Sequence, residues 1–122
     1  MKVIYILIAS VILSSCTKEL KYTKEQLYLK ALAADSSVSF ILPKTLEDGI
    51  KCQDYTDGCV AGHTIQVQKL NMIAVEFMTE EQAKYAAKKF RGYYLRNWLF
   101  DDVTGEPALE RFIEKSLEAK RP

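Results

Sequence analysis

The spacing of apolar residues changes its period once between residues 64 and 90, and this change constrains the fold more than any other feature of the sequence. Residues 64–69 and 72–78 alternate polar and apolar side chains, as half-buried β-strands do. Residues 79–91 instead repeat apolar side chains at helical spacing, on Ala83, Ala86, Ala87 and Phe90. With a turn near Leu70 and Asn71, the sequence predicts a β-hairpin followed by a helix.

Capping residues mark where two helices begin. Thr79 stands three residues before Gln82, and this spacing forms a capping box at the start of a helix. Gly92 is placed to end the same helix in the left-handed conformation. A second Thr-x-x-Gln pattern at Thr23 predicts a short amphipathic helix over residues 24–34.

The remaining segments complete an α+β pattern. Residues 38–42 are apolar and stop at Pro43, which predicts a short or edge strand. Residues 44–62 carry the glycines and polar residues of a loop. The aromatic segment 93–100 is expected to be one strand, and Pro107 suits the first position of a last helix. This order predicts an α+β two-layer sandwich, in which a small, mostly antiparallel sheet carries its helices on one face.

The N-terminal residues form a separate unit. Lys2 supplies a short positive start, residues 3–13 are mainly apolar, and small residues precede Cys16. The apolar run is too short to cross a bilayer as a helix, which needs ~20 residues. This layout is that of an export signal.

The sequence Leu13-Ser14-Ser15-Cys16 resembles the lipobox of bacterial lipoprotein precursors. The resemblance implies that signal peptidase II cuts before Cys16 and that diacylglycerol is joined to its thiol. Residues 1–15 are then a signal peptide, residues 16–22 a lipidated cysteine with a short tether, and residues 23–122 a single domain. The alternative is an ordinary secretory signal, or a short anchor, with an incidental cysteine. No cofactor is expected besides the covalent lipid on Cys16.

Residues 73–91 are similar to a strand–helix unit of ferredoxin-like folds, through Ile73-Ala-Val-Glu-Phe77 and Thr79-Glu-Glu-Gln-Ala83. Similar segments occur in peptidoglycan-binding SPOR domains. In those domains a helix follows the first strand directly, whereas here a second strand follows it. The resemblance therefore implies an α+β fold and assigns no function.

Charge and tether length limit the partners of the domain. The chain holds 17 Lys and Arg against 16 Asp and Glu, and this near-neutrality disfavours nucleic acid as a partner. Residues Thr17–Tyr22 span at most ~20 Å when extended, so an anchored domain stays close to its membrane. We expect a bacterial membrane as one partner and a membrane-proximal envelope protein, rather than peptidoglycan, as the other. By the rule of enteric lipoproteins, Thr17 in place of Asp favours the outer membrane.

Two further cysteines, Cys52 and Cys59, are expected to pair as a disulfide in an oxidising compartment. Closing a loop of about eight residues stabilises a fold by roughly 2–3 kcal/mol. Asp54, Asp57 and His63 lie in or beside the same loop, and a metal site is therefore the alternative. Because this spacing matches no strong zinc pattern, we favour a disulfide-closed surface loop without a metal.

Acidic residues gather after the aromatic segment, beginning with Asp101 and Asp102. Paired carboxylates can divide acid and base roles between them. Adjacent strand residues point to opposite sides, however, and both Asp residues suit a turn. We therefore expect a non-catalytic binding domain of the cell envelope. A small envelope enzyme or metal-binding protein, using the Cys52–His63 loop or the Asp101/Asp102 turn, is the alternative.

The aromatic segment supplies the candidate binding residues Tyr94, Arg96 and Trp98. Alternation along a single strand places these three side chains on one face. If that face is exposed, it forms a platform for sugar rings or for a partner protein. If it packs under the helices, Trp98 joins the core while Arg96 extends its charge to solvent, and this second arrangement is the one we favour.

Overall fold

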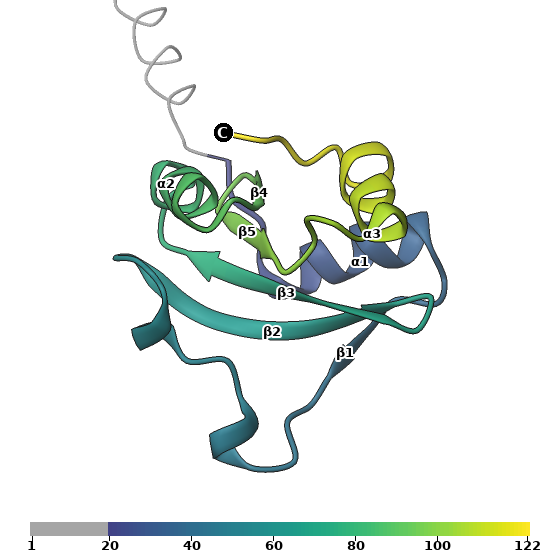
Figure 1. Cartoon of the computed structure of the whole chain (residues 1–122), viewed down its shortest axis with the longest axis horizontal. Coiled ribbons are helices and arrows are strands. Elements are labelled where there is room, and N and C mark those ends of the chain that lie inside the picture. Colours follow the sequence, from purple (N-terminus) through teal and green to yellow (C-terminus); the bar gives the residue numbers. More distant parts are fainter. Residues whose placement is uncertain (1–19) are drawn as a thin grey trace, which may run out of the picture.

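The computed structural model describes residues 20–122, which form one sheet flanked by helices (Figure 1). The expected α+β class with an antiparallel sheet is confirmed. The predicted signal peptide and Cys16 lie outside the described residues. In chain order the elements are α1 (Lys24–Ala34), β1 (Ser39–Ile41), η3 (Leu46–Asp48), η4 (Cys52–Asp54), β2 (Cys59–Val67), β3 (Leu70–Phe77), α2 (Glu80–Phe90), β4 (Tyr93–Leu95), β5 (Trp98–Asp101), α3 (Pro107–Arg111) and η5 (Phe112–Ser116).

The sheet has the strand order β1-β2-β3-β5-β4, and every neighbouring pair is antiparallel. The expected hairpin is present as β2 and β3, but its turn lies at Gln68 and Lys69, two residues before the predicted position. Both turn residues have positive φ, 51° and 68°, which a tight two-residue hairpin requires. Such turns usually carry Asn-Gly, so a Gln-Lys pair does not reveal the turn in the sequence.

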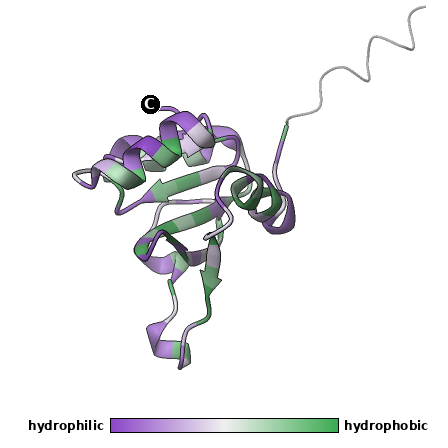
Figure 2. Ribbon diagram, turned by 90° about the vertical axis from the view of Figure 1, so that its right-hand side faces the viewer, coloured by the Kyte–Doolittle hydropathy of each residue, from purple (hydrophilic) through white to green (hydrophobic). Residues whose placement is uncertain are grey.

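Side chains of the central strands point alternately to two faces of the sheet, and each face has its own core. On the first face, Met72 and Ala74 of β3 pack with residues of α1, α3, η5 and β5. On the second face, Val75 and Phe77 of β3 pack against the alanine stripe of α2. Figure 2 shows the hydrophobic residues along the strands and polar residues on the outer sides of the helices.

The helices are therefore divided between the two faces rather than gathered on one. α1 and α3 lie side by side on the first face (Figure 1), and α2 covers the second face over β4 and β5. The reason is that β3 is apolar on both sides, and a strand of that kind needs cover on both. The strand–helix unit expected at residues 73–91 is present as β3 and α2, and its likeness to ferredoxin-like folds stays a prediction.

Segment 93–100 was expected to be one strand, and this prediction is wrong. β4 and β5 form a hairpin that turns at Arg96, with φ of 52°, and Asn97. Asn97 is buried: its Oδ1 accepts from the Tyr22 backbone N–H at 2.8 Å, and its amide donates to the carbonyls of Tyr22 and Phe77 at 3.3 Å. Aromatic residues continue on both sides of this turn, so alternation alone does not indicate it.

The observed helix starts agree with the sequence-based predictions more closely than the helix ends do. Thr23 and Gln26 form a full capping box, and the Thr79 hydroxyl accepts from the Gln82 backbone N–H at 3.1 Å. Gly92 was expected to adopt the left-handed conformation at the end of α2, and this prediction is wrong: the left-handed residue is Arg91, with φ of 57°. Gly92 serves a different purpose, because a Cβ there would lie 2.4 Å from the carbonyl oxygen of Phe100.

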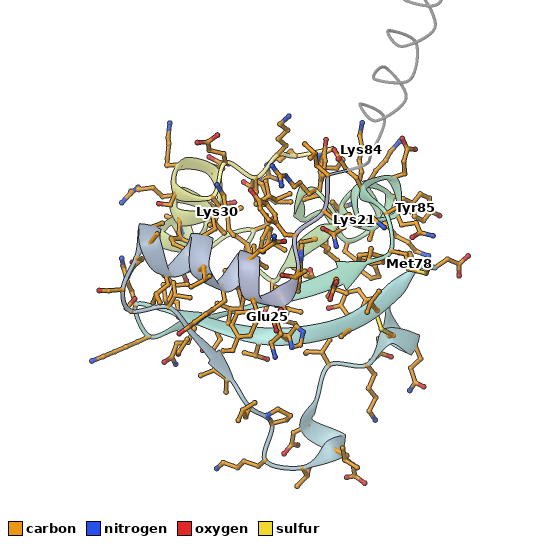
Figure 3. All side chains as sticks on the ribbon, turned by 180° about the vertical axis from the view of Figure 1, so that it is seen from behind. Lys21, Glu25, Lys30, Met78, Lys84 and Tyr85 are labelled. Carbon is orange, nitrogen blue, oxygen red and sulfur yellow. A yellow bond between two sulfur atoms is a disulfide. The ribbon has the colours of Figure 1, made fainter. Side chains whose placement is uncertain are left out.

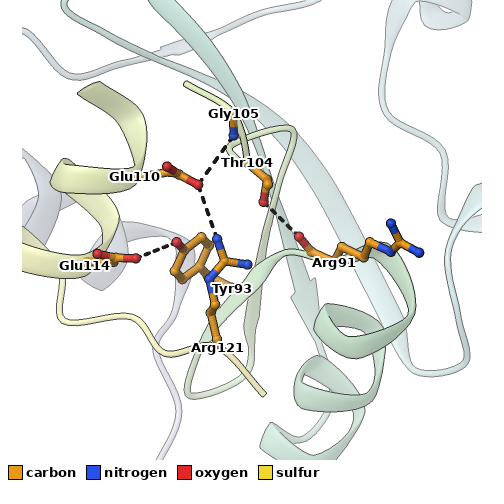
Figure 4. Close-up of polar contacts among 7 residues, drawn as sticks. All are labelled: Arg91, Tyr93, Thr104, Gly105, Glu110, Glu114 and Arg121. Carbon is orange, nitrogen blue, oxygen red and sulfur yellow. Dashed lines mark hydrogen bonds and ion pairs between the residues drawn. The ribbon is translucent and has the colours of Figure 1, made fainter. Parts of the chain in front are cut away.

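The C-terminal tail runs along the free edge of β4. Tyr94 and Lys120 exchange two backbone hydrogen bonds, each 2.8 Å long. The guanidinium of Arg121 lies 4.3 Å from the centroid of the Tyr93 ring and 3.2 Å from a carboxylate oxygen of Glu110 (Figure 4). The tail thus covers one edge of the sheet.

Candidate functional site

The structure separates the three candidate binding residues of the aromatic segment. Trp98 is fully buried, and its indole N–H donates to the Tyr22 carbonyl at 2.9 Å. Arg96 lies in the turn, with its guanidinium 4.0 Å from the centroid of the Tyr22 ring. Tyr94 is half-buried in β4. The three side chains therefore do not share one exposed platform, although Tyr94 and Arg96 still line an open cavity of about 390 Å³.

The Cys52–Cys59 disulfide is confirmed. It joins η4 to the first residue of β2, so the loop expected to end at residue 62 ends at residue 58 instead. Gly58 has φ of 88°, and a Cβ there would lie 2.1 Å from Oε1 of Gln82 in α2. The loop closed by the disulfide therefore packs closely against the start of α2.

An open cavity of about 670 Å³ lies between this loop and α2. Tyr55 and Phe90 form an aromatic contact in its wall, with ring centroids 5.0 Å apart. Tyr85 on α2 is 61% exposed at its rim, and Figure 3 shows its side chain at the outer surface. We call this cavity the disulfide-loop pocket; its wall consists of Gln53, Asp54, Tyr55, Thr56, Asp57, Glu81, Gln82, Tyr85, Lys89 and Phe90.

Polar groups give the disulfide-loop pocket an acidic character. Its wall includes the carboxylates of Asp54, Asp57 and Glu81 and the ammonium of Lys89. Two buried oxygens belong to residues of the wall, Thr56 Oγ1 and Gln82 Oε1, and neither has a hydrogen-bond partner within residues 20–122. Aromatic surface beside an excess of carboxylates suits a basic or amphipathic side chain of a partner.

Asp101 ties the disulfide loop to the sheet. Its Oδ2 accepts from the Tyr55 hydroxyl at 2.9 Å, and its Oδ1 accepts from the Asp102 backbone N–H at 2.8 Å. Burial raises the pKa of the Tyr55 phenol, and the nearby Asp101 carboxylate raises it further, so the phenol remains a donor. The side chain of Asp101 is thus engaged in holding the loop, while Asp102 is exposed in a turn with φ of 62°.

His63 lies on the first face of the sheet, away from the disulfide-loop pocket. Its ring stacks on Phe40 with centroids 5.5 Å apart. Burial lowers the pKa of the imidazole, and the Lys24 ammonium lowers it further. Within residues 20–122, no three His, Cys, Asp or Glu residues are grouped so as to hold a metal ion. The alternative metal site in the Cys52–His63 loop therefore has no ligand set in this part of the chain.

A second cavity of about 670 Å³ lies beneath the loop between β1 and η4. Leu42 and Leu46 on this loop are 81% and 95% exposed. Figure 1 shows the loop extending from the sheet on the side opposite the first described residues. Sequence reasoning missed both cavities, because their walls come from loops whose paths depend on packing. One signal was present: Tyr85 is an aromatic residue outside the apolar stripe of α2.

Comparisons with models of protein families, with curated proteins and with solved structures give no match for this chain. None of the helices in residues 20–122 is long and apolar enough to cross a membrane.

Proposed function

We propose that this chain is an exported bacterial lipoprotein, anchored through a lipid on Cys16, whose folded domain is a non-catalytic binding module of the cell envelope. The observation that carries the proposal is Leu13-Ser14-Ser15-Cys16 after an apolar run of signal-peptide length. The Cys52–Cys59 disulfide supports it, because such bonds persist in oxidising compartments. The lipid is the only prosthetic group in the proposal.

The fixed position of Tyr22 supports a partner near the membrane. Both backbone polar groups of Tyr22 are bonded to Asn97, so the tether ends there. Cys16 lies six residues earlier in the sequence, and an extended chain of this length spans at most ~20 Å. The domain then reaches neighbouring envelope proteins in preference to peptidoglycan. Because residue 17 is Thr and not Asp, the proposed membrane is the outer one.

The disulfide-loop pocket is the proposed contact for that partner. Exposed tyrosines are frequent among the residues that dominate protein interfaces, and Tyr85 stands at the rim of the pocket. Three carboxylates in the wall favour a basic side chain from the partner. The disulfide and Asp101 hold the loop in place, which lowers the entropy lost on binding.

The lipid anchor is tested by metabolic labelling with an alkyne-bearing fatty acid. We expect the full-length chain and the Thr17→Ser variant to incorporate the label and to sediment with membranes. The Cys16→Ser variant should do neither, because only the Cys16 thiol accepts the lipid. Incorporation that survives Cys16→Ser would overturn the proposed anchor.

The pocket is tested with a photoreactive amino acid in place of Tyr85 in the intact envelope, and with the same probe in place of the exposed Ser36 as a control. We expect one envelope protein to be captured from position 85 and not from position 36. Glu81→Lys should reduce this capture, because it reverses a charge in the pocket wall. Equal capture at both positions would contradict the assignment of the pocket.

A further inference from the structure

Cationic side chains gather where the described chain begins. Lys30, Arg96 and Lys120 line one cavity together with Leu20. The ammonium of Lys84 lies 6.0 Å from the centroid of the Tyr94 ring, which belongs to the same wall. Figure 3 shows Lys21 and Lys84 at this end of the molecule. We call this surface the basic face and define it as Lys21, Lys30, Lys84, Arg96 and Lys120.

Positive charge is in excess on the basic face. Its cavity wall holds the cations Lys30, Arg96 and Lys120 against the carboxylates of Glu80 and Glu118. Lys21 and Lys84 add two positive charges beside this wall. The whole chain is almost neutral, and the disulfide-loop pocket carries more carboxylates than cations. The charges of the domain are thus unevenly distributed, with positive charge concentrated beside the start of the fold.

Aromatic and apolar groups accompany these cations. Leu20 is 63% exposed, and Tyr22 and Tyr94 are half-buried beneath charged side chains. The Arg96 guanidinium lies 4.0 Å from the Tyr22 ring centroid. Tyrosine rings capped by Lys and Arg are typical of surfaces at lipid headgroups, where an apolar body meets a polar boundary.

We propose that the basic face binds the anionic headgroups of the membrane that carries the lipid anchor. This inference rests on the proposed function, because the lipid on Cys16 brings the face to the bilayer. Cys16 precedes Leu20 by four residues, which span at most ~14 Å when extended, so Leu20 and its surroundings must lie near the bilayer surface. Each Lys or Arg close to an anionic surface strengthens the contact about fivefold.

This contact fixes the orientation of the domain. With the basic face on the membrane, the loop that carries Leu46 projects away from the bilayer (Figure 1). The disulfide-loop pocket then lies at the side of the domain, open to a neighbouring membrane-bound partner.

The test uses the lipidated full-length protein in vesicles and measures the acylation of each lysine by mass spectrometry. In vesicles containing phosphatidylglycerol, we expect Lys21, Lys30, Lys84 and Lys120 to react at least about fivefold more slowly than in phosphatidylcholine vesicles. High salt should remove this protection, because it screens the attraction. Lys44 and Lys51, which lie exposed in the loop between β1 and β2, serve as internal controls and should react equally in all vesicles.

Matched variants separate this contact from the anchor. In the triple variant Lys21→Gln, Lys84→Gln, Lys120→Gln, Lys30 should react as fast in phosphatidylglycerol vesicles as in phosphatidylcholine vesicles. The remaining positive charge is then too small to hold the basic face on the membrane. Removal of the same charge elsewhere, by Lys44→Gln, Lys51→Gln and Lys69→Gln, should leave Lys30 protected. If Cys16 carries the lipid and the lysines react equally in both kinds of vesicle, this inference alone is overturned. A chain without lipid on Cys16 in the same spectra would overturn the proposed function and this inference with it.

Discussion

At the scale of single residues, two glycines show what holds the wall of the disulfide-loop pocket. Gly58 and Gly105 have φ of 88° and 92°, a region in which other residues are strained. They differ in their surroundings. A Cβ at Gly58 would lie 2.1 Å from Gln82 Oε1, whereas a Cβ at Gly105 would meet nothing within 4 Å. Comparing substitutions at these two glycines therefore distinguishes the effect of backbone strain from the effect of the contact with α2.

We expect Gly58→Ala to lower the free energy of unfolding more than Gly105→Ala does. Each substitution places alanine at positive φ, at a cost of about 1–2 kcal/mol. Only Gly58→Ala must also displace the Gln82 side chain from the pocket wall. Urea unfolding of both variants measures the difference. Equal losses would show that Gln82 moves aside without cost.

A second residue-scale prediction concerns pH. Burial lowers the pKa of His63 below its ordinary value of 6.5, so the unfolded chain takes up a proton at a higher pH than the folded domain. The contribution of His63 to the unfolding free energy is thus fully present above pH 6.5 and is lost as the pH falls below 6.5. His63→Gln should reduce the decline of unfolding free energy between about pH 7 and about pH 5. Urea titrations across this range test it, and an unchanged slope would rule out His63 as the source.

At the scale of elements, the β4–β5 hairpin depends on one buried amide. Asn97 bonds to the backbone of Tyr22 and of Phe77, and so joins the N-terminal segment and β3 to this turn. Trp98 adds a further bond to the same Tyr22 carbonyl. The position at which the tether meets the domain is therefore set by a turn far along the chain.

We expect Asn97→Ala to cost about 2–3 kcal/mol of unfolding free energy, because it leaves buried backbone groups without partners. Asn71→Ala is the matched control: its side chain accepts one hydrogen bond, from Gln66, at an exposed site, and its loss should cost at most ~0.5 kcal/mol. Hydrogen exchange at the Tyr22 amide should accelerate in the Asn97 variant only. Slow exchange there would mean that the N-terminal segment is held by other contacts.

At the scale of the whole molecule, the tail protects an edge of the sheet. Tyr94 in β4 would present a free backbone N–H and carbonyl without its two bonds to Lys120. Exposed strand edges of this kind promote pairing between chains. On the first face, Leu117 and Ala119 of the same C-terminal segment are buried in the core.

Deletion of residues 120–122 should therefore cause concentration-dependent association, because it removes the Lys120 bridge and uncovers the edge of β4 while the core residue Ala119 remains. Deletion of residues 121 and 122 alone removes the surface ion pair of Arg121 with Glu110 but keeps the Lys120 bridge, and should leave the size of the protein unchanged. Light scattering over a range of concentrations compares the two chains. Identical behaviour would contradict a protective role for the tail.

The elements that local pattern defines could be predicted from the sequence. The capping residues Thr23 and Thr79 mark the starts of α1 and α2, and alternation marks β3. The Cys52–Cys59 pair was also predictable, because the two cysteines are only seven residues apart in the sequence. The two hairpin turns were not predicted correctly, although a turn is also a local feature. The reason is that the turns at Gln68 and at Arg96 use residues that are rarely found at positive φ.

The sequence by itself determined the α+β class, the disulfide and an N-terminus that resembles a lipoprotein signal, because each depends on residues close together in the chain. Only the tertiary structure decided that Trp98 is core, that α2 covers the second face, and that loop and helix enclose the disulfide-loop pocket. It also gathered Lys30, Lys84 and Lys120 around the first described residues. The physical reason is that burial and charge proximity depend on contacts between distant segments, which no local spacing records.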